Sequence, residues 1–242
     1  MTGAAKWTGF AVLAVVAAGC ASRSDVETLK KEVAELKATQ AQLVKRVGGV
    51  PEPKALPASI DLSGGQFKGS TTSPVVLVEF SDYECPYCIR HFTQVMPQIE
   101  AAYIQTNKIR YTFHDFPIDQ LHPESIRAHV AAHCAVEQGK FWNLHPLLFS
   151  KAGSHTPAEL QSVAQQAGLN MGAFSACVAA DKYSAAIRQS TAFAISMGAE
   201  GTPFFLVGLI DGHNQMKPLT KLPGAYPFAQ FQQAIDAALG QK

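Results

Sequence analysis

The sequence predicts an α/β domain that is interrupted by a block of helices and preceded by a separate coiled-coil helix. An apolar, β-branched run at residues 75–80 has the character of a buried strand, and a helix that opens with two cysteines follows it. Residues 122–198 show helical patterns throughout, with strand patterns on either side. Residues 25–47 repeat apolar side chains at alternating spacings of three and four, which is typical of a coiled coil.

The composition fits one globular domain with appendages. The 242 residues are 47% hydrophobic and 16% charged. A net charge of +1 gives no electrostatic reason to expect nucleic acid as a partner. Four of the five cysteines remain when Cys20 is set aside, and an even number permits two disulfides in an oxidising compartment.

Residues 1–19 have the features of a bacterial export signal. Lys6 supplies positive charge, and residues 7–18 form an apolar stretch too short to span a bilayer comfortably. The small residues before Cys20 resemble a lipoprotein cleavage box, which implies acyl chains on Cys20 that anchor the protein to a membrane. By the usual lipoprotein sorting pattern, Ala21 favours the outer membrane over the inner one. An ordinary signal peptide with an incidental cysteine is the alternative.

Residues 20–47 would then hold the lipidated N-terminus and a dimerisation helix. Heptad position a is occupied by Val26, Val33, Gln40 and Val47, and position d by Leu29, Leu36 and Leu43. Valine at a with leucine at d favours two parallel strands, so we expect a homodimer through residues 25–47, with a trimer left open. A lone amphipathic helix lying on the globular domain is the alternative.

A linker rich in proline and glycine at residues 48–59 precedes the globular domain. The first part of the domain, residues 60–121, contains the 75–80 strand, the cysteine helix and a second strand at Lys108–His114. Strand, helix and strand in this order predict a βαβ unit.

The helical insertion of residues 122–198 separates this unit from the second part of the domain, residues 199–242. Within the insertion, Thr156–Glu159 is a capping box that starts a helix. The elements expected in residues 199–242 are a strand at Phe204–Ile210, a weaker strand at Gln215–Leu219 and a last helix at Pro227–Leu239.

Cys85, Pro86, Tyr87 and Cys88 occupy the first turn of the helix that follows the buried strand. Pro86 suits this turn because its missing N–H is not needed there. The helix N-terminus favours negative charge at Cys85, and such surroundings lower the pKa of a thiol from about 8.5 to roughly 3.5–7.5. We expect Cys88, one turn in, to be shielded. This arrangement is what dithiol–disulfide exchange requires.

Half of a zinc site is the alternative for the two cysteines. No second Cys-x-x-Cys and no nearby histidine pair completes four ligands, so we expect no metal and no cofactor. His129 and His133, four residues apart, could face one metal, but no carboxylate motif accompanies them. An exposed helix edge is the favoured account of these histidines.

Two further sites are predicted within apolar segments, one at a carboxylate and one at a pair of cysteines. Glu79 lies within the buried strand, where a carboxylate is costly unless it has a task or a partner. Strand alternation leaves open that Glu79 faces outward from an edge. Cys134 and Cys177 each lie on the apolar stripe of a helix, which predicts a structural disulfide between them in an oxidising compartment. Two separate buried thiols are the alternative.

Four motifs occur in the same order as in a known family: Glu79–Cys88, Phe116-Pro117 with His122-Pro123, Cys134–Trp142, and Gly201-Thr202-Pro203. Together they resemble the DsbA-like thiol–disulfide oxidoreductases of the thioredoxin superfamily over residues 60–242. The lipid signal and the coiled coil further resemble a dimeric lipoprotein branch of that family.

The resemblance implies a thioredoxin fold with an inserted helical subdomain, in a periplasmic enzyme that acts on exported proteins and is reset by a membrane redox partner. It implies that Cys85 is the nucleophile, that Cys88 is the resolving thiol and that Thr202–Pro203 is a cis peptide facing them. It also implies that Glu79 relays a proton to and from Cys88.

Thr202 before the proline, with Pro86 and Tyr87 between the cysteines, resembles the periplasmic disulfide isomerases more than the monomeric oxidase. We therefore expect a protein that both oxidises and isomerises disulfides. A dedicated oxidase is the alternative within the enzyme class. A chaperone-like lipoprotein that binds through the thioredoxin groove without turnover is a further alternative, and the intact pair of cysteines argues against it.

Overall fold

The computed structural model describes residues 23–46, 55–151 and 153–241. Several sequence predictions lie outside the described residues: the export signal at residues 1–19, the lipidation site Cys20, heptad residue Val47 and residues 48–54 of the linker. None of the helices in the described ranges combines the length and the apolar character that a membrane span requires.

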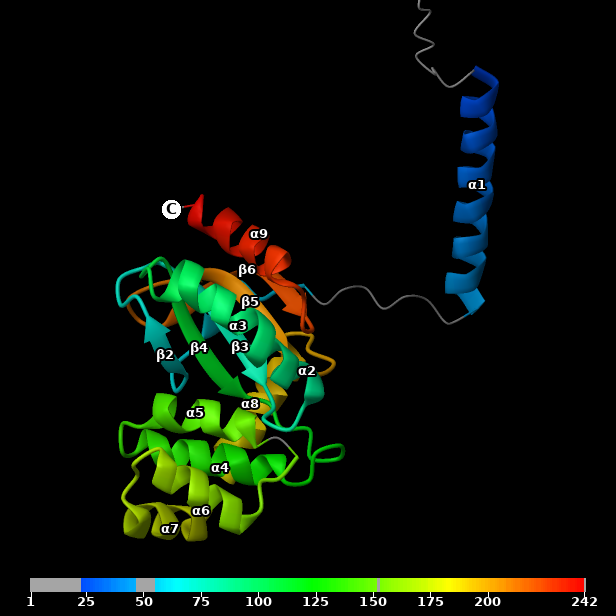
Figure 1. The fold of residues 1–242 in the computed structure, drawn as a ribbon. Helices are drawn as coiled ribbons and strands as arrows, with labels where there is room; N and C mark the ends of the chain where they lie inside the picture. Colours follow the sequence, from blue (N-terminus) through cyan, green and yellow to red (C-terminus); the bar gives the residue numbers. More distant parts are fainter. Residues whose placement is uncertain (1–22, 47–54, 152, 242) are drawn as a thin grey trace, which may run out of the picture. The chain divides into compact units, whose positions relative to one another are not determined.

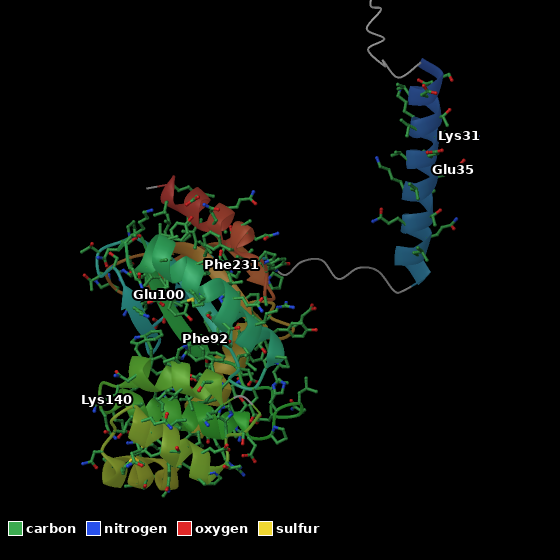
Figure 2. The ribbon with its side chains drawn as sticks, in the orientation of Figure 1. Lys31, Glu35, Phe92, Glu100, Lys140 and Phe231 are labelled. Atoms are coloured by element: carbon green, nitrogen blue, oxygen red, sulfur yellow. A yellow bond between two sulfur atoms is a disulfide. The ribbon has the colours of Figure 1, made fainter. Side chains whose placement is uncertain are left out.

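The chain divides into two units, Met1–Glu52 and Pro53–Lys242 (Figure 1). The described part of the first unit is one helix, α1 (Arg23–Arg46). Its exposed large apolar side chains, from 40% to 69% accessible, are Val26, Leu29, Val33, Leu36 and Leu43. Lys31 and Glu35, labelled in Figure 2, fall at other heptad positions. The predicted coiled coil thus has an exposed apolar row on α1, and pairing of two such helices stays a prediction.

The second unit is built on a six-stranded mixed sheet with β3 in its interior. In spatial order the strands are β1 (Ile60–Asp61), β6 (Gln215–Pro223), β5 (Phe204–Ile210), β3 (Val75–Ser81), β4 (Arg110–Asp115) and β2 (Gln66–Gly69). β3 runs parallel to β4 and antiparallel to β5. All of β3 is buried, which explains why its sequence is nearly a continuous apolar run.

β1 and β2 are not predicted from the sequence, and β4 and β6 end later than their patterns predict. Strands of two and four residues give too little alternation to be recognised. β4 extends one residue past the predicted end at His114, to Asp115, and β6 continues past Leu219 to Pro223. The extension of β4 brings in Asp115, whose carboxylate is a hydrogen-bond acceptor for two histidines.

Helices cover both faces of this sheet. After Cys85 the chain forms α2 (Pro86–Arg90), a π-helical turn η1 (His91–Val95), α3 (Met96–Ile99) and a second π-helical turn η2 (Glu100–Ile104). Of these segments, η1, α3 and η2 pack with α9 (Phe228–Leu239) against Val75 and Leu77 of β3. Val76 and Val78, which alternate with them, face the end of α8 on the other side. Phe231 of α9 and Phe92 of η1 are labelled in Figure 2.

Along the chain, the helical insertion follows β4 and precedes β5. Its helices are α4 (Ser125–Val136), α5 (Phe141–Ser150), α6 (Pro157–Gln166), α7 (Met171–Ala180) and α8 (Ser184–Ser196) (Figure 1). Thr156 caps α6 by accepting the Glu159 N–H, as the capping box predicts. Glu159 differs from the usual motif, because its carboxylate accepts the Thr156 hydroxyl at 2.9 Å.

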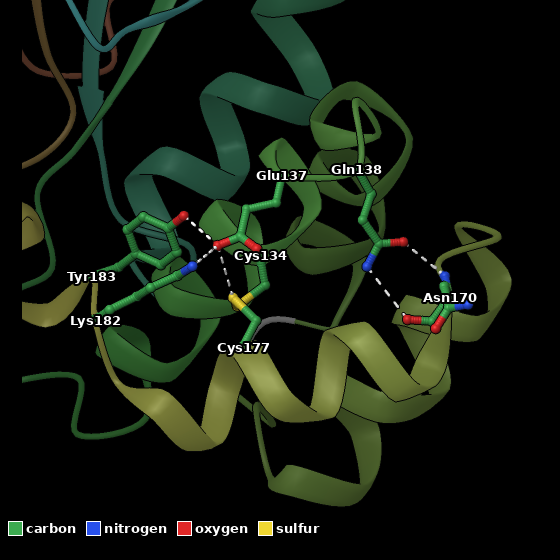
Figure 3. Close-up of a disulfide and its surroundings, with 7 residues drawn as sticks. All are labelled: Cys134, Glu137, Gln138, Asn170, Cys177, Lys182 and Tyr183. Atoms are coloured by element: carbon green, nitrogen blue, oxygen red, sulfur yellow. Dashed lines mark hydrogen bonds and ion pairs between the residues drawn. A yellow bond between two sulfur atoms is a disulfide. The ribbon is translucent and has the colours of Figure 1, made fainter.

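A disulfide joins Cys134 of α4 to Cys177 of α7, with the two Cα atoms 5.8 Å apart (Figure 3). Both cysteines are buried. Polar contacts flank the disulfide: the Glu137 carboxylate accepts the Tyr183 hydroxyl and pairs with Lys182. The side chain of Gln138 exchanges two hydrogen bonds with the backbone of Asn170, of 2.8 and 3.3 Å. The end of α4 is therefore fixed to both ends of α7.

Candidate active site

Cys85 caps the N-terminus of α2, and Pro86 follows it in the first turn. Cys85 is 4% exposed, and its thiol donates to the carbonyl oxygen of Thr202 across 3.4 Å. The pKa of Cys85 is lowered to about 6, above all because the Cys88 thiol can donate to the Cys85 sulfur. The side chain of Thr202 and the backbone N–H groups of Cys88 and Tyr87 also stabilise the thiolate, against the opposing effect of burial.

Cys88 lies fully buried one turn into α2. Burial raises its pKa well above the ordinary thiol value, and the neighbouring Cys85 raises it further. Near neutral pH the pair therefore holds one proton, on Cys88, and one negative charge, on Cys85. One reactive thiolate and one protected thiol are what disulfide exchange needs.

Thr202–Pro203 is a cis peptide at the start of β5. The antiparallel register of β5 and β3 pairs Phe204 with Phe80. This register places the cis peptide beside the end of β3, where the turn to Cys85 begins. The structure therefore brings Thr202, Pro203 and Cys85 together from segments 117 residues apart.

Tyr87 is exposed in the cysteine turn, as is Pro86, and 59% of its surface is accessible. The guanidinium of Arg90 lies 5.2 Å from the centre of the Tyr87 ring, in a cation–π contact. A surface cavity of about 360 Å³ beside this pair is lined by Thr202 and Tyr226 as well. Apolar and cationic groups thus border the cis peptide.

Glu79 is 2% exposed within β3, and it accepts the hydroxyl of Tyr111 at 2.6 Å. The alternative of an outward-facing edge residue is wrong, because β4 and β5 flank β3 on both sides. Burial raises the pKa of Glu79 to about 7, while the hydroxyls of Tyr111 and Ser81 act to lower it. Burial raises the pKa of Cys88, and Ser81 opposes this rise too. Ser81 lies two residues after Glu79, on the same face of β3.

Asp82 organises the turn before Cys85, and sequence reasoning missed it. Its carboxylate accepts the N–H groups of Glu84 at 2.8 Å and Ile118 at 2.9 Å. His122 and Ser125 also bond to it. Burial alone would raise the pKa of Asp82, but the charge of His129 and these hydrogen bonds hold it below its ordinary value. Asp82 thus ties the cysteine turn to the Phe116–Ser125 loop.

His129 and His133 are not on an exposed helix edge, so that prediction is wrong. His129 is fully buried, and its Nδ1 lies 2.6 Å from one oxygen of Asp115. Nε2 of His133 lies 2.7 Å from the other oxygen. The physical reason is that β4 runs on to Asp115 and presents its carboxylate to α4. Burial acts to raise the pKa of Asp115, but both histidines hold it well below its usual range.

Comparisons with known proteins place the whole globular unit in one family. The family model described as thioredoxin matches residues 62–237. The crystal structure of α-DsbA1 from Wolbachia pipientis is similar at a TM-score of 0.64 and 25% identity, over 77% of this chain and 94% of that one. The predicted α/β thioredoxin-like fold with a helical insertion is thereby confirmed.

Two curated relatives differ in how much of their length this chain matches. A candidate protein-disulfide oxidoreductase of Rickettsia conorii is 26% identical over 180 residues, 72% of this chain and 60% of the relative. A Na⁺/H⁺ antiporter NhaA of Salinispora tropica is 31% identical over 148 residues, 61% of this chain. This chain spans only 22% of the antiporter's length. On the family model and the shared fold, the chain belongs to the DsbA-like proteins of the thioredoxin superfamily.

Proposed function

We propose that this protein is a thiol–disulfide oxidoreductase that oxidises thiols and isomerises disulfides in exported proteins through Cys85 and Cys88. The observation that supports this most strongly is the contrast between the two thiols. Cys85 has a lowered pKa and contacts a cis peptide, while Cys88 is buried with a raised pKa. The similarity to α-DsbA1 and to the candidate oxidoreductase of Rickettsia conorii supports the same class of reaction.

Oxidation of a substrate begins from the Cys85–Cys88 disulfide. A substrate thiolate attacks the Cys85 sulfur and breaks that bond, and the released Cys88 thiolate takes up a proton. A second substrate thiolate then attacks the substrate sulfur of the mixed disulfide, and Cys85 leaves as a thiolate. The substrate loses two electrons and the cysteine pair gains them. Because the Cys85 thiolate is stabilised, Cys85 is a good leaving group and its disulfide is oxidising.

Isomerisation begins from the reduced pair. The Cys85 thiolate attacks a substrate disulfide, and the substrate thiolate that is released can attack another disulfide in the same chain. When Cys85 is displaced again, no net electrons have been transferred. Cys88 resolves complexes that do not rearrange. Thr202 next to the cis proline supports this activity by its resemblance to isomerases.

We assign to Glu79 the role of accepting the proton that Cys88 loses and of returning it. A buried thiol cannot attack a mixed disulfide until a base removes its proton. Glu79 has a pKa of about 7, so it can both accept and return a proton near neutral pH.

The backbone at Thr202–Pro203 is assigned to substrate binding. An extended peptide can pair with such backbone as an added strand, which gives affinity with little sequence preference. Tyr87 and Arg90 border the adjacent cavity and offer contacts to the substrate's side chains. This suits an enzyme that acts on many unfolded chains.

We assign two roles to the N-terminal segments: anchoring the enzyme to a membrane and joining two copies of it in a dimer. We propose that Cys20 is lipidated, that the protein faces the periplasm from the outer membrane, and that α1 forms a parallel homodimer. The exposed apolar row of α1 supports the dimer, since such a row is stabilised when a second helix covers it. Two sites on one dimer raise the effective concentration of the second site for a bound substrate. A membrane redox partner would reset the cysteines.

Reactivation of scrambled ribonuclease tests the proposal with three variants of the full chain. Wild-type protein is expected to restore ribonuclease activity, and Cys85→Ser to leave it at the uncatalysed level. Leu29→Glu with Leu36→Glu places charge at two exposed d positions of α1. That variant should sediment as a monomer, isomerise less, and still oxidise reduced ribonuclease. Ala38→Glu, a matched charge outside the apolar row, should behave as wild type.

The outcomes separate the alternatives. Equal isomerisation by the monomeric variant would favour an isomerase that needs no dimer. Oxidation without isomerisation by the wild-type protein would favour a dedicated oxidase. Full biological activity of a protein with both Cys85 and Cys88 replaced would favour the chaperone-like alternative.

A further inference from the structure

The imidazole of His91 is a buried polar group without a hydrogen bond. Its side chain is fully buried, and within the described residues neither Nδ1 nor Nε2 has a hydrogen-bond partner. Phe205 and Phe231 pack against the ring with centroids 4.5 and 5.0 Å away, and they offer it no acceptor. Buried polar groups in folded proteins are nearly always paired, so an orphaned imidazole calls for a physical account.

One side of the ring faces Glu79. Nε2 of His91 lies 3.8 Å from Oε2 of Glu79, the oxygen that also accepts the Tyr111 hydroxyl. That distance is too long for a direct hydrogen bond, but a small side-chain movement or one bridging water would close it. His91 is therefore next to the carboxyl group that is assigned the proton of Cys88.

His91 is also one of the residues that line a surface cavity. This cavity, of about 470 Å³, is lined by Arg90, His91, Gln94, Gln98 and Tyr226, among others. His91 also begins the π-helical turn η1, an irregularity that is often found at functional sites. His91 thus stands between a solvent-facing cavity and a carboxyl group that is itself 2% exposed.

We propose that His91 carries protons between the cavity and Glu79, and so controls how fast Cys88 loses and regains its proton. This inference rests on the proposed function. His91 acts through Glu79 and does not contact the reacting sulfurs, so it is a positioning residue for proton transfer. When Cys88 closes the Cys85–Cys88 bond, its proton passes to Glu79. Glu79 then donates to Nε2 of the neutral ring, and the Nδ1 proton leaves to water in the cavity.

The ring is in the neutral form that this transfer needs. Burial lowers the pKa of His91 to about 3, so the ring is neutral near pH 7 and has one donor and one acceptor nitrogen. The titratable group facing it is Glu79 from β3, which contacts Tyr111 of β4 in turn. β5 and α9 present Phe205 and Phe231, and Arg90 precedes His91 along the chain.

Single-turnover resolution of a mixed disulfide between Cys85 and a peptide, measured from pH 5 to 9, tests the inference. His91→Ala is expected to slow Cys88-dependent resolution by about a hundredfold, the lower end of the range for positioned proton transfer. Added imidazole should restore the rate in proportion to its concentration, because the missing side chain borders the cavity. His91→Phe, which keeps the volume, should be slow and should not respond to imidazole. Gln98→Ala, a control that lines the same cavity, should match wild type.

Each outcome has a distinct meaning. If His91→Phe, the variant that preserves packing, resolves the disulfide at the wild-type rate across the pH range, the inference is overturned. If His91→Ala is slow but imidazole and other small bases have no effect, the role of His91 is structural and the inference is also overturned. Failure of the proposed function looks different, since wild-type protein itself would then show no Cys85-dependent exchange.

Discussion

Replacing Cys88 by serine should convert the protein from a catalyst into a trap for its substrates. Cys85 keeps the helix N-terminus, the Thr202 side chain and the backbone N–H groups that stabilise its thiolate, so it still attacks substrate disulfides. Without the buried thiol, the mixed disulfide has no internal partner to resolve it. Release then depends on external thiols, and the long-lived complex should become the main product.

Non-reducing electrophoresis after incubation with oxidised, unfolded ribonuclease measures this trapping. Cys88→Ser should yield a covalent complex that a reductant dissolves. Cys85→Ser is the matched control and should yield none, because Cys88 is fully buried and keeps its proton. Complexes of equal yield in the two variants would contradict the assignment of nucleophile and resolving thiol.

Removal of the Cys134–Cys177 disulfide should lower the free energy of unfolding by about 4 kcal/mol. In the chain-entropy model, this value follows from the sequence separation of 43 between the cysteines, which sets the length of the loop that the crosslink constrains in the unfolded chain. Chemical denaturation of a Cys134→Ala, Cys177→Ala protein against wild type measures the loss. When Cys85 and Cys88 are also replaced by serine in both proteins, a reductant should leave the variant's stability unchanged. A loss below about 1 kcal/mol would show that the crosslink adds little.

The local patterns around the cysteines predicted the centre of the molecule well. The run at Val75–Phe80 is apolar because β3 is covered on both faces, and such a strand is visible in the sequence. Pro86 in the first turn of α2 is a similarly local signal. The short strands β1 and β2 lacked such a signal, since their place depends on pairing with β6 and β4.

The polar surroundings of the site could not be predicted from spacing. His129 and His133 look like a surface pair on a helix, and only the approach of Asp115 from β4 makes them partners of one carboxylate. Asp82 looks like an ordinary turn residue after a strand, yet it holds the loop at Ile118. No sequence motif marks His91. Its distinguishing feature is that neither ring nitrogen has a hydrogen-bond partner within the described structure. Contacts between distant segments decide all three cases.

The pH dependence of the reduced protein follows from the same thiol. The pKa of Cys85 is lowered to about 6 in the folded protein, from about 8.5 for a free thiol. A depressed acid pKa stabilises the folded state fully above the unfolded value and loses that effect as the pH falls through the folded value. The contribution of Cys85 should therefore decline between about pH 8.5 and about pH 6.

Ultraviolet titration of the Cys85 thiolate, taken as the difference between wild-type and Cys85→Ser protein in the reduced state, is the most direct measurement. A transition centred at about pH 6 is the predicted result. A transition near pH 8.5, like that of free cysteine, would contradict the account, because the site would then lack the stabilised thiolate on which the proposed exchange reactions depend.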